Sequence, residues 1–200
     1  MNRVAAVRDF RLNSVKEATR RCADTPTLFM EIKEPKSDYL LIPATSSEQR
    51  RYIPIGYVGQ EVIPNNAVQF VPDATLYHLG ILTSNVHMAW MRVVAGRLKS
   101  DYRYSGSIVY NNFPWPTPTE AQKQKIEQTA QAILDARAKY PDSSLADLYD
   151  ELTMPAELRK AHQDNDRAVM QAYGFPIKGF TEADCVAELM KLYQALTEKS

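Results

Sequence analysis

The sequence predicts an α+β protein in which a small twisted sheet with a long packed helix is followed by an all-helical C-terminal domain. Short runs rich in β-branched and aromatic residues lie early in the chain, and one long apolar run with helical spacing follows them. Beyond a proline-rich stretch, only helical patterns remain. The 200 residues suffice to bury a substantial core, and 44% hydrophobic with 24% charged residues is ordinary for a globular protein.

The first part of the chain changes from helical to strand patterns. Residues 3–19 have the apolar spacing of a helix, with an interruption expected at Asn13 and Ser14. After Pro26, short apolar segments alternate with Pro, Gly and Asn, which is typical of strands and turns. The predicted strands are residues 27–33, 38–44, 51–58 and 67–73.

Residues 75–96 predict one long, mostly buried helix. Its large apolar side chains recur every three or four residues, and Gly96 lies near its end. The stretch NNFPWPTPT at 111–119 contains three prolines and is incompatible with a helix or a central strand. We expect it to join two parts, with Phe113 and Trp115 buried between them because the flanking prolines hold both rings rigidly.

The second half of the chain predicts helices throughout. Thr119 is expected to cap the first of them, residues 144–152 form a short helical piece, and the next helix ends at Gly174. A Thr-x-x-Asp box at Thr181 begins the last one. The expected domains are a helical lead-in at 1–19, a mixed domain at 20–118 and a helical domain at 119–200.

Charge and cysteine content restrict the class of protein. Residues 1–115 contain 14 Lys and Arg against 10 Asp and Glu, whereas residues 116–200 contain 10 against 14. This asymmetry suggests an anionic partner for the first part only. Cys22 and Cys185 are isolated, which fits a reducing compartment, and no apolar run approaches the length of a membrane span. We therefore expect a cytoplasmic protein with no membrane partner.

The sequence predicts no catalytic or metal site. It has seven glycines, none in a phosphate-binding or cofactor-binding loop. NNFPWP departs from the catalytic motif of amino-methyltransferases, because Phe113 stands where a proline is required. Glu31 and Lys33 have the Glu-x-Lys spacing of metal-dependent nucleases but lack a clear second acid, and His78 and His87 lack a third ligand.

The segment RLKSDYRYS at 97–105 has residue types suited to DNA. Arg and Lys neutralise phosphates and can donate to guanine, Asp can accept from the cytosine amino group, and Tyr and Ser can hydrogen-bond phosphates. The competing interpretation is a solvated connection in which Arg97 caps the preceding helix through the helix dipole.

Long motifs then indicate a family. SSEQRRYIPIGYV, YHLGILTSNVHMAWMRVVAGRLKSDYRYS and VYNNFPWP resemble the target-recognition domain of MmeI-like type II restriction–modification enzymes. QTAQAILDARAKYPDSSLADLYDELTMPAELRKAHQDNDRAVMQAYGF resembles the helical domain that follows it in that family. The resemblance implies a parent polypeptide with a nuclease that uses magnesium and an adenine-specific DNA methyltransferase that uses S-adenosylmethionine. The chain itself contains neither catalytic part, and no cofactor is expected in it.

The resemblance also implies which residues contact double-stranded DNA. Lys99 and Asp101 match a pair that reads one base pair, and because they are two residues apart in an extended loop they would project to the same side. The residues expected to read bases are Lys99, Asp101, Arg103, Asn66, Ala67 and Ala44. Those expected to contact the DNA backbone are Arg50, Arg51, Arg97, Tyr102, Tyr104 and Ser105.

Three hypotheses remain open at this point. The first is a sequence-specific DNA recognition module of a methyltransferase–endonuclease, with the other domains of the polypeptide as partners. The second is a protein-interaction or scaffold module that uses the acidic helical surface. The third is a self-sufficient nuclease that uses Glu31 and Lys33. The basic segment and the long motifs favour the first.

Overall fold

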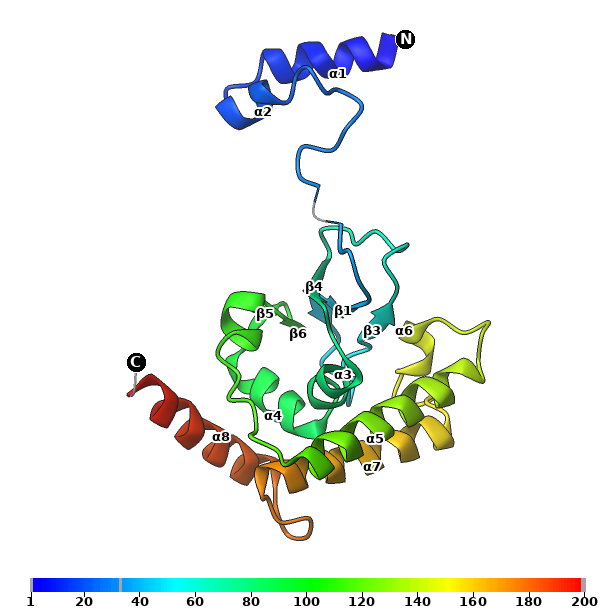
Figure 1. Cartoon of the computed structure of the whole chain (residues 1–200), viewed down its shortest axis with the longest axis vertical. Coiled ribbons are helices and arrows are strands. Elements are labelled where there is room, and N and C mark those ends of the chain that lie inside the picture. Colours follow the sequence, from blue (N-terminus) through cyan, green and yellow to red (C-terminus); the bar gives the residue numbers. More distant parts are fainter. Residues whose placement is uncertain (1, 33, 199–200) are drawn as a thin grey trace. The chain divides into compact units, whose positions relative to one another are not determined.

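The computed structural model describes residues 2–32 and 34–198, which fall into two compact units divided after Glu34 (Figure 1). The first unit contains two helices and confirms the interruption expected at Asn13 and Ser14. The Arg11 guanidinium donates to the backbone carbonyls of Cys22, Thr25 and Leu28 at 2.7–2.8 Å, and so ties the segment after the second helix to the first. The two helices are α1 (Asn2–Leu12) and α2 (Glu17–Arg21).

The strand expected at 27–33 is absent from the described residues 27–32, so that prediction is wrong there; Lys33 lies outside the described residues. The Leu28 carbonyl, and the Thr25 carbonyl just before this region, accept from Arg11 instead of from a neighbouring strand. The Glu-x-Lys motif therefore has no strand beneath Glu31.

The second unit contains two small antiparallel sheets where the sequence suggested one. The first has the strand order β3-β1-β4, and the second has the order β2-β6-β5. Ala44 joins them, because its N–H donates to the carbonyl of Ala67 and its own carbonyl accepts from Tyr104, both at 2.9 Å. The strands are β1 (Tyr39–Pro43), β2 (Thr45–Ser46), β3 (Gly56–Val58), β4 (Val68–Pro72), β5 (Gly96–Leu98) and β6 (Asp101–Arg103).

The long helix expected at 75–96 is divided into α3 (Leu76–Leu82) and α4 (Asn85–Val94), so the prediction of a single helix is wrong. The Ser84 backbone is extended, and its hydroxyl accepts from the N–H of His87, which begins a new helix. Thr83 donates its hydroxyl proton back to the Leu79 carbonyl at 2.7 Å. Two adjacent hydroxyl side chains therefore end one helix and cap the next.

Helices α5 and α7 lie side by side and pack beneath the sheets and α3 (Figure 1). The predicted boundaries are largely confirmed: Thr119 and Thr181 form capping boxes, and Gly174 ends α7 with a left-handed φ of 74°. A Cβ at Gly80 would lie 2.5 Å from Ile126 Cγ2, so α3 approaches α5 closely because residue 80 is glycine. The helices are α5 (Glu120–Ala138), α6 (Leu145–Leu148), α7 (Ala156–Tyr173) and α8 (Glu182–Thr197).

The proline-rich stretch connects the mixed and helical regions through aromatic contacts. Phe113 is buried, and its ring contacts His87 edge-on at 4.5 Å and Tyr173 of α7 at 6.4 Å between ring centroids. Trp115 is only half-buried, against Tyr77, so the expectation of full burial holds for Phe113 and not for Trp115. Within the second unit, sheets and helices share one hydrophobic core. In the described residues, no helix is long and apolar enough to cross a membrane.

Candidate nucleic-acid interface

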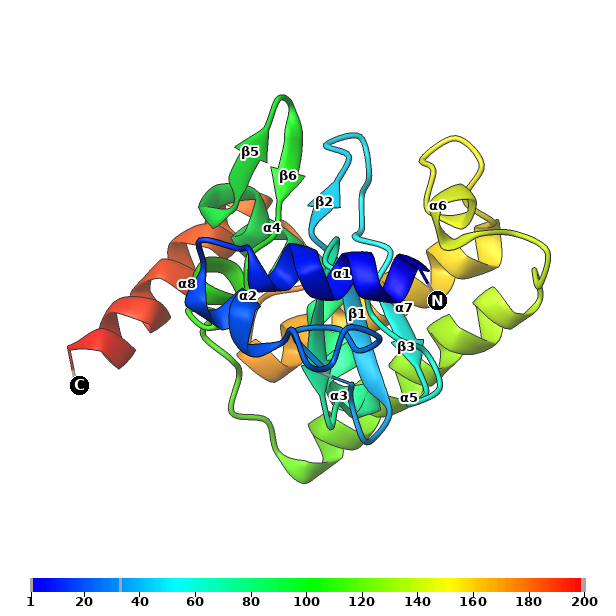
Figure 2. The same ribbon diagram turned by 90° about the horizontal axis from the view of Figure 1, so that it is seen from above.

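The basic segment forms a β-hairpin that stands out beside the loop after β2 (Figure 2). Leu98 pairs with Asp101, so Lys99 and Ser100 are the two residues of the turn. Lys99 has φ of 57°, the left-handed conformation that hairpin turns require at a central position. The expectation of an extended loop is therefore wrong: Lys99 is exposed at the tip, and Asp101 begins the returning strand.

Asp101 is half-buried and held by a distant part of the chain. Its Oδ1 accepts from the backbone N–H of Glu48 at 3.3 Å. Glu48 lies in the loop after β2, 53 positions away in sequence. In the described chain, no hydrogen bond reaches the second carboxylate oxygen, Oδ2. Asp101 thus has one anchored oxygen and one that is free to accept.

Arg97 is the most constrained of the exposed bases on the hairpin. Its guanidinium lies over the ring of Tyr102, 3.8 Å from the ring centroid, and Nη1 donates to the Ser100 carbonyl at 2.7 Å. The same nitrogen is 3.7 Å from Glu48 Oε2. Arg97 therefore interacts mainly with its own hairpin and the neighbouring loop, which differs from the expected phosphate contact.

Both hairpin tyrosines point away from solvent, which corrects the expectation that they contact phosphates. Tyr102 is 7% exposed beneath Arg97, and Tyr104 is 2% exposed with its hydroxyl 3.0 Å from His87 Nε2. Burial raises the pKa of Tyr104 and lowers the pKa of His87 to about 3, so both are neutral at pH 7. These aromatic groups support the hairpin from below.

The remaining base-reading candidates lie at the junction of the two sheets. Ala44 and Ala67 are hydrogen-bonded neighbours, and Arg103 pairs with Thr45 directly beside Ala44. Asn66 is exposed in the turn before β4, where Asn65 Oδ1 accepts from the N–H of Ala67 at 2.8 Å. The fold therefore brings strand ends that are distant in sequence to one edge, next to the hairpin.

A cleft of about 400 Å³ is lined by Arg50 and Arg51, the other two arginines predicted to contact the DNA backbone. Arg51 lies 5.7 Å from the centroid of the Tyr52 ring, and Arg92 donates to the carbonyl of Arg51 and to Glu182. Ser105 caps a short π-helical turn, Gly106–Tyr110, by accepting from Ile108, which leaves its hydroxyl proton available to donate. The cleft is lined by Glu48, Gln49, Arg50, Arg51, Asn85, Arg92, Glu151 and Glu182.

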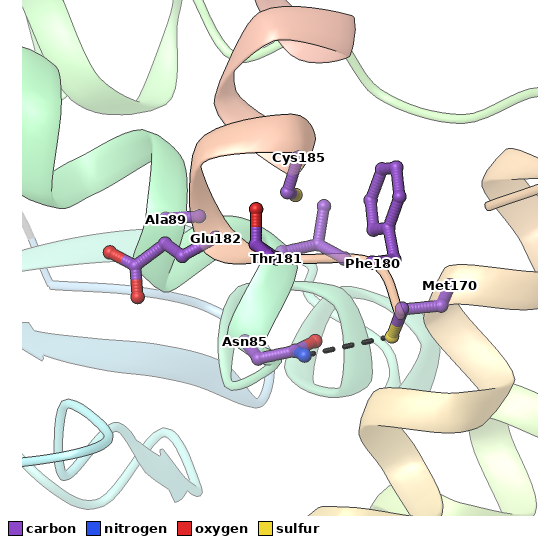
Figure 3. A pocket seen from close by; sticks show the side chains of 8 residues that line it. Asn85, Ala89, Met170, Phe180, Thr181, Glu182 and Cys185 are labelled. Atoms are coloured by element: carbon purple, nitrogen blue, oxygen red, sulfur yellow. Dashed lines mark hydrogen bonds between the residues drawn. The ribbon is translucent and has the colours of Figure 1, made fainter. Parts of the chain in front are cut away.

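A second, smaller cavity of about 80 Å³ lies where α4, α7 and α8 meet (Figure 3). Its wall includes the buried thiol of Cys185 and Asn85, whose Nδ2 is 3.6 Å from Met170 Sδ. It is built by the helices and not by the hairpin. No group of three or more His, Cys, Asp or Glu suited to a metal ion occurs in the described residues.

Sequence reasoning missed the residues that hold the hairpin. Glu48 and His87 act through contacts with residues far away in sequence, and neither belongs to a spacing pattern. For Glu48, the signal in the sequence was its position just before Arg50 and Arg51, in a motif that resembles a known family.

Fold and site together define a class of protein, a small α+β module that presents a basic hairpin and strand ends on a helical support. The family model described as "MmeI, target recognition domain" matches residues 1–117, and "MmeI, C-terminal domain" matches residues 118–199. The chain belongs to this MmeI family.

Two known proteins resemble almost the whole chain. The solved structure of the type IIL restriction-modification enzyme MmeI in complex with DNA matches with a TM-score of 0.90 and 51% identity, over 98% of this chain and 26% of that one. DNA methyltransferase A of Bacillus subtilis (strain 168) is 40% identical over 198 residues, which are 98% of this chain and 22% of that protein. The chain thus spans about a quarter of the length of these relatives.

Proposed function

We propose that this chain is the double-stranded DNA recognition module of a restriction–modification enzyme. The observation that carries the proposal is its 51% identity, at a TM-score of 0.90, to an enzyme whose structure contains DNA. The family models, which together match residues 1–199, favour this function over a protein-interaction module that uses the acidic helices. Within the chain, residues 20–118 carry recognition and residues 119–200 support it.

The catalytic functions belong to the remainder of a longer polypeptide. A relative four to five times longer is a DNA methyltransferase, which implies S-adenosylmethionine as its methyl donor, and a restriction activity implies magnesium in a nuclease. The described residues show no group fitted to hold a metal ion. We assign the methyltransferase and nuclease domains of the same polypeptide as partners and the cytoplasm as the compartment.

Lys99 and Asp101 read one G·C pair in the proposed complex. Lys99, exposed at the turn, donates to guanine O6 and N7 in the major groove, while Asp101 accepts from the amino group of the paired cytosine through Oδ2. The alternative is that Lys99 and Asp101 only form an ion pair with each other in solvent. Such an exposed pair would contribute only about 0–1 kcal/mol to stability, which makes it the weaker explanation for the two residues. A specific base contact is worth about 1–3 kcal/mol of discrimination.

The other candidates take graded roles. Arg103, Asn66, Ala67 and Ala44 lie along the same edge and face the neighbouring bases. Arg50 and Arg51, which line the cleft, contact phosphates. Ser105, whose hydroxyl proton is available, donates to a phosphate, whereas Tyr102 and Tyr104 are buried and we assign them to support.

A charge exchange tests the base assignment. Lys99→Glu with Asp101→Arg should invert the preference from G·C to C·G at one position, because glutamate accepts from cytosine and arginine donates to guanine. The net charge is unchanged, and glutamate at position 99 meets the same left-handed backbone as lysine. Wild type should bind its preferred base pair about 5- to 150-fold more tightly than the others.

Binding to a randomised duplex library, followed by titrations with individual duplexes, measures this preference. The matched control exchanges Glu188 and Lys191, an exposed ion pair at 2.7 Å on α8, and should leave the preference unchanged. A double variant that keeps the original preference at every position would show that the pair reads no base. Wild type that binds no duplex, even in tens of millimolar salt, would refute DNA recognition itself.

A further inference from the structure

The hairpin that presents Lys99 and Asp101 is too small to hold its own shape. Each strand has three residues, and the turn places a lysine in a left-handed conformation that non-glycine residues rarely adopt. An isolated two-stranded hairpin is marginally stable in water. Base discrimination requires the reading side chains to be held in position, so other groups must fix them.

Arg97 is placed to fix the turn. It pairs across the hairpin with Tyr102, and its guanidinium lies on that ring while Nη1 reaches the Ser100 carbonyl. One planar group thus connects the outgoing strand, the returning strand and the turn. This geometry needs the flat fork of arginine, because a lysine ammonium is a compact charge that does not stack in the same way.

Glu48 connects the same hairpin to the rest of the protein. Its backbone N–H holds Asp101 Oδ1 at 3.3 Å, and its carboxylate oxygen Oε2 lies 3.7 Å from Arg97 Nη1. The loop that carries Glu48 is anchored further on by Tyr52, whose buried hydroxyl donates to Asp166 of α7 at 2.6 Å. A chain of contacts therefore runs from the base-reading carboxylate to the helical part.

We propose that Arg97 and Glu48 are positioning residues that set base discrimination, with Arg97 acting inside the hairpin and not as a phosphate ligand. This inference rests on the proposed function, since it assumes that Lys99 and Asp101 read a base pair. Arg97 maintains the turn that aims Lys99, and Glu48 orients Asp101 so that Oδ2 faces outward. The helical part contributes to specificity through the loop at 48–52 without touching DNA.

Substitution of Arg97 distinguishes positioning from phosphate binding. Affinities of the whole chain for the preferred duplex and the three duplexes changed at that base pair are measured for Arg97→Lys and Arg97→Ala across a salt series. Positioning predicts that both variants lose discrimination by about 2- to 13-fold, the factor that corresponds to one hydrogen bond. The dependence of log affinity on log salt should stay as in wild type, because no phosphate contact is lost.

Arg50→Ala is the matched control, because Arg50 lies at the cleft and makes no ion pair in the described residues. It should weaken all four duplexes equally and reduce the salt slope by about 0.9. Glu48→Pro, which removes the backbone N–H that holds Asp101, should lower discrimination without changing that slope, whereas Glu48→Gln, which keeps the N–H, should change discrimination little. Thermal unfolding of each variant is measured alongside; the hairpin is exposed, so the main transition should be retained.

The inference is overturned if Arg97→Lys behaves as wild type while Arg97→Ala weakens all duplexes equally with a shallower salt slope. That result would make Arg97 a phosphate ligand and leave DNA recognition intact. Equal discrimination in wild type and Glu48→Pro would remove Glu48 from the proposal. Wild type that discriminates among none of the four duplexes would instead refute the base assignment of Lys99 and Asp101.

Discussion

Asp166 offers a direct test of how the helical part supports the recognition part. The carboxylate is 6% exposed on α7, and its two oxygens accept from the Tyr52 hydroxyl at 2.6 Å and from the Asn85 N–H at 2.8 Å. Burial is the main reason that its pKa rises from 3.8 to about 6, since removal from water penalises the charged form. These hydrogen bonds lower the pKa and offset part of that penalty.

The raised pKa fixes the sign of a pH effect. Because folded Asp166 binds its proton more tightly than the unfolded chain does, its contribution to stability is complete below about pH 4 and is lost as the pH rises to about 6. A difference between 3.8 and about 6, at 1.36 kcal/mol per pH unit, corresponds to about 3 kcal/mol. The folded protein therefore carries this cost at neutral pH.

Asp166→Asn should remove the charge and retain both hydrogen bonds. The amide oxygen can accept from Asn85, and the amide nitrogen can donate to the Tyr52 oxygen. Relative to wild type, the variant should gain about 3 kcal/mol in free energy of unfolding between pH 4 and pH 7. Urea denaturation followed by circular dichroism at several pH values measures this difference.

Asp164→Asn serves as the control on the same helix. Hydrogen bonds and ion pairs with Lys160 and Arg167 lower the pKa of Asp164, so its contribution is present at neutral pH and lost as the pH falls through its folded pKa. That variant should therefore lose stability at neutral pH, the opposite direction. If Asp166→Asn shows no gain over wild type between pH 4 and pH 7, the reasoning from burial is refuted.

Two further predictions concern packing and thiol chemistry. Gly80→Ala should destabilise the protein by about 1–3 kcal/mol in urea denaturation, because the added Cβ would lie 2.5 Å from Ile126 Cγ2. Gly96→Ala is the control and should change the stability little, because the nearest atom to its Cβ would be 3.9 Å away. Equal effects of the two substitutions would contradict the packing argument. Iodoacetamide should modify the partly exposed Cys22 well before Cys185, because burial raises the pKa of the Cys185 thiol to about 12. Mass spectrometry of the folded chain measures the two rates, and equal rates would argue against the burial of Cys185.

Local sequence signals determined the helix ends of this protein. Thr119 and Thr181 each cap their own helix through residues three positions later, and Gly174 ends α7 because it adopts a left-handed φ without strain. These interactions lie within one turn of the chain, so the sequence shows both partners together. The long motifs likewise indicated the family from the sequence alone, because many residues of each motif match the family together.

Tertiary structure decided what apolar patterns left ambiguous. The apolar spacing of 75–96 continues across Thr83 and Ser84, yet these two hydroxyls bond the backbone and divide the helix. Residues 27–32 have strand composition and no strand; the Leu28 carbonyl there, like the Thr25 carbonyl just before, accepts from the Arg11 side chain. Composition does not reveal which partner a backbone group finds.

In the candidate site, too, the sequence determined the residue types and the tertiary structure decided their arrangement. The residue types of 97–105 predicted a segment suited to DNA, and the family resemblance predicted which side chains would read bases. Only the fold showed that Lys99 forms the turn, that Tyr104 is buried against His87, and that Glu48 holds Asp101. These contacts join residues 17 to 53 positions apart, and their geometry depends on sheet register and core packing, which no local pattern encodes.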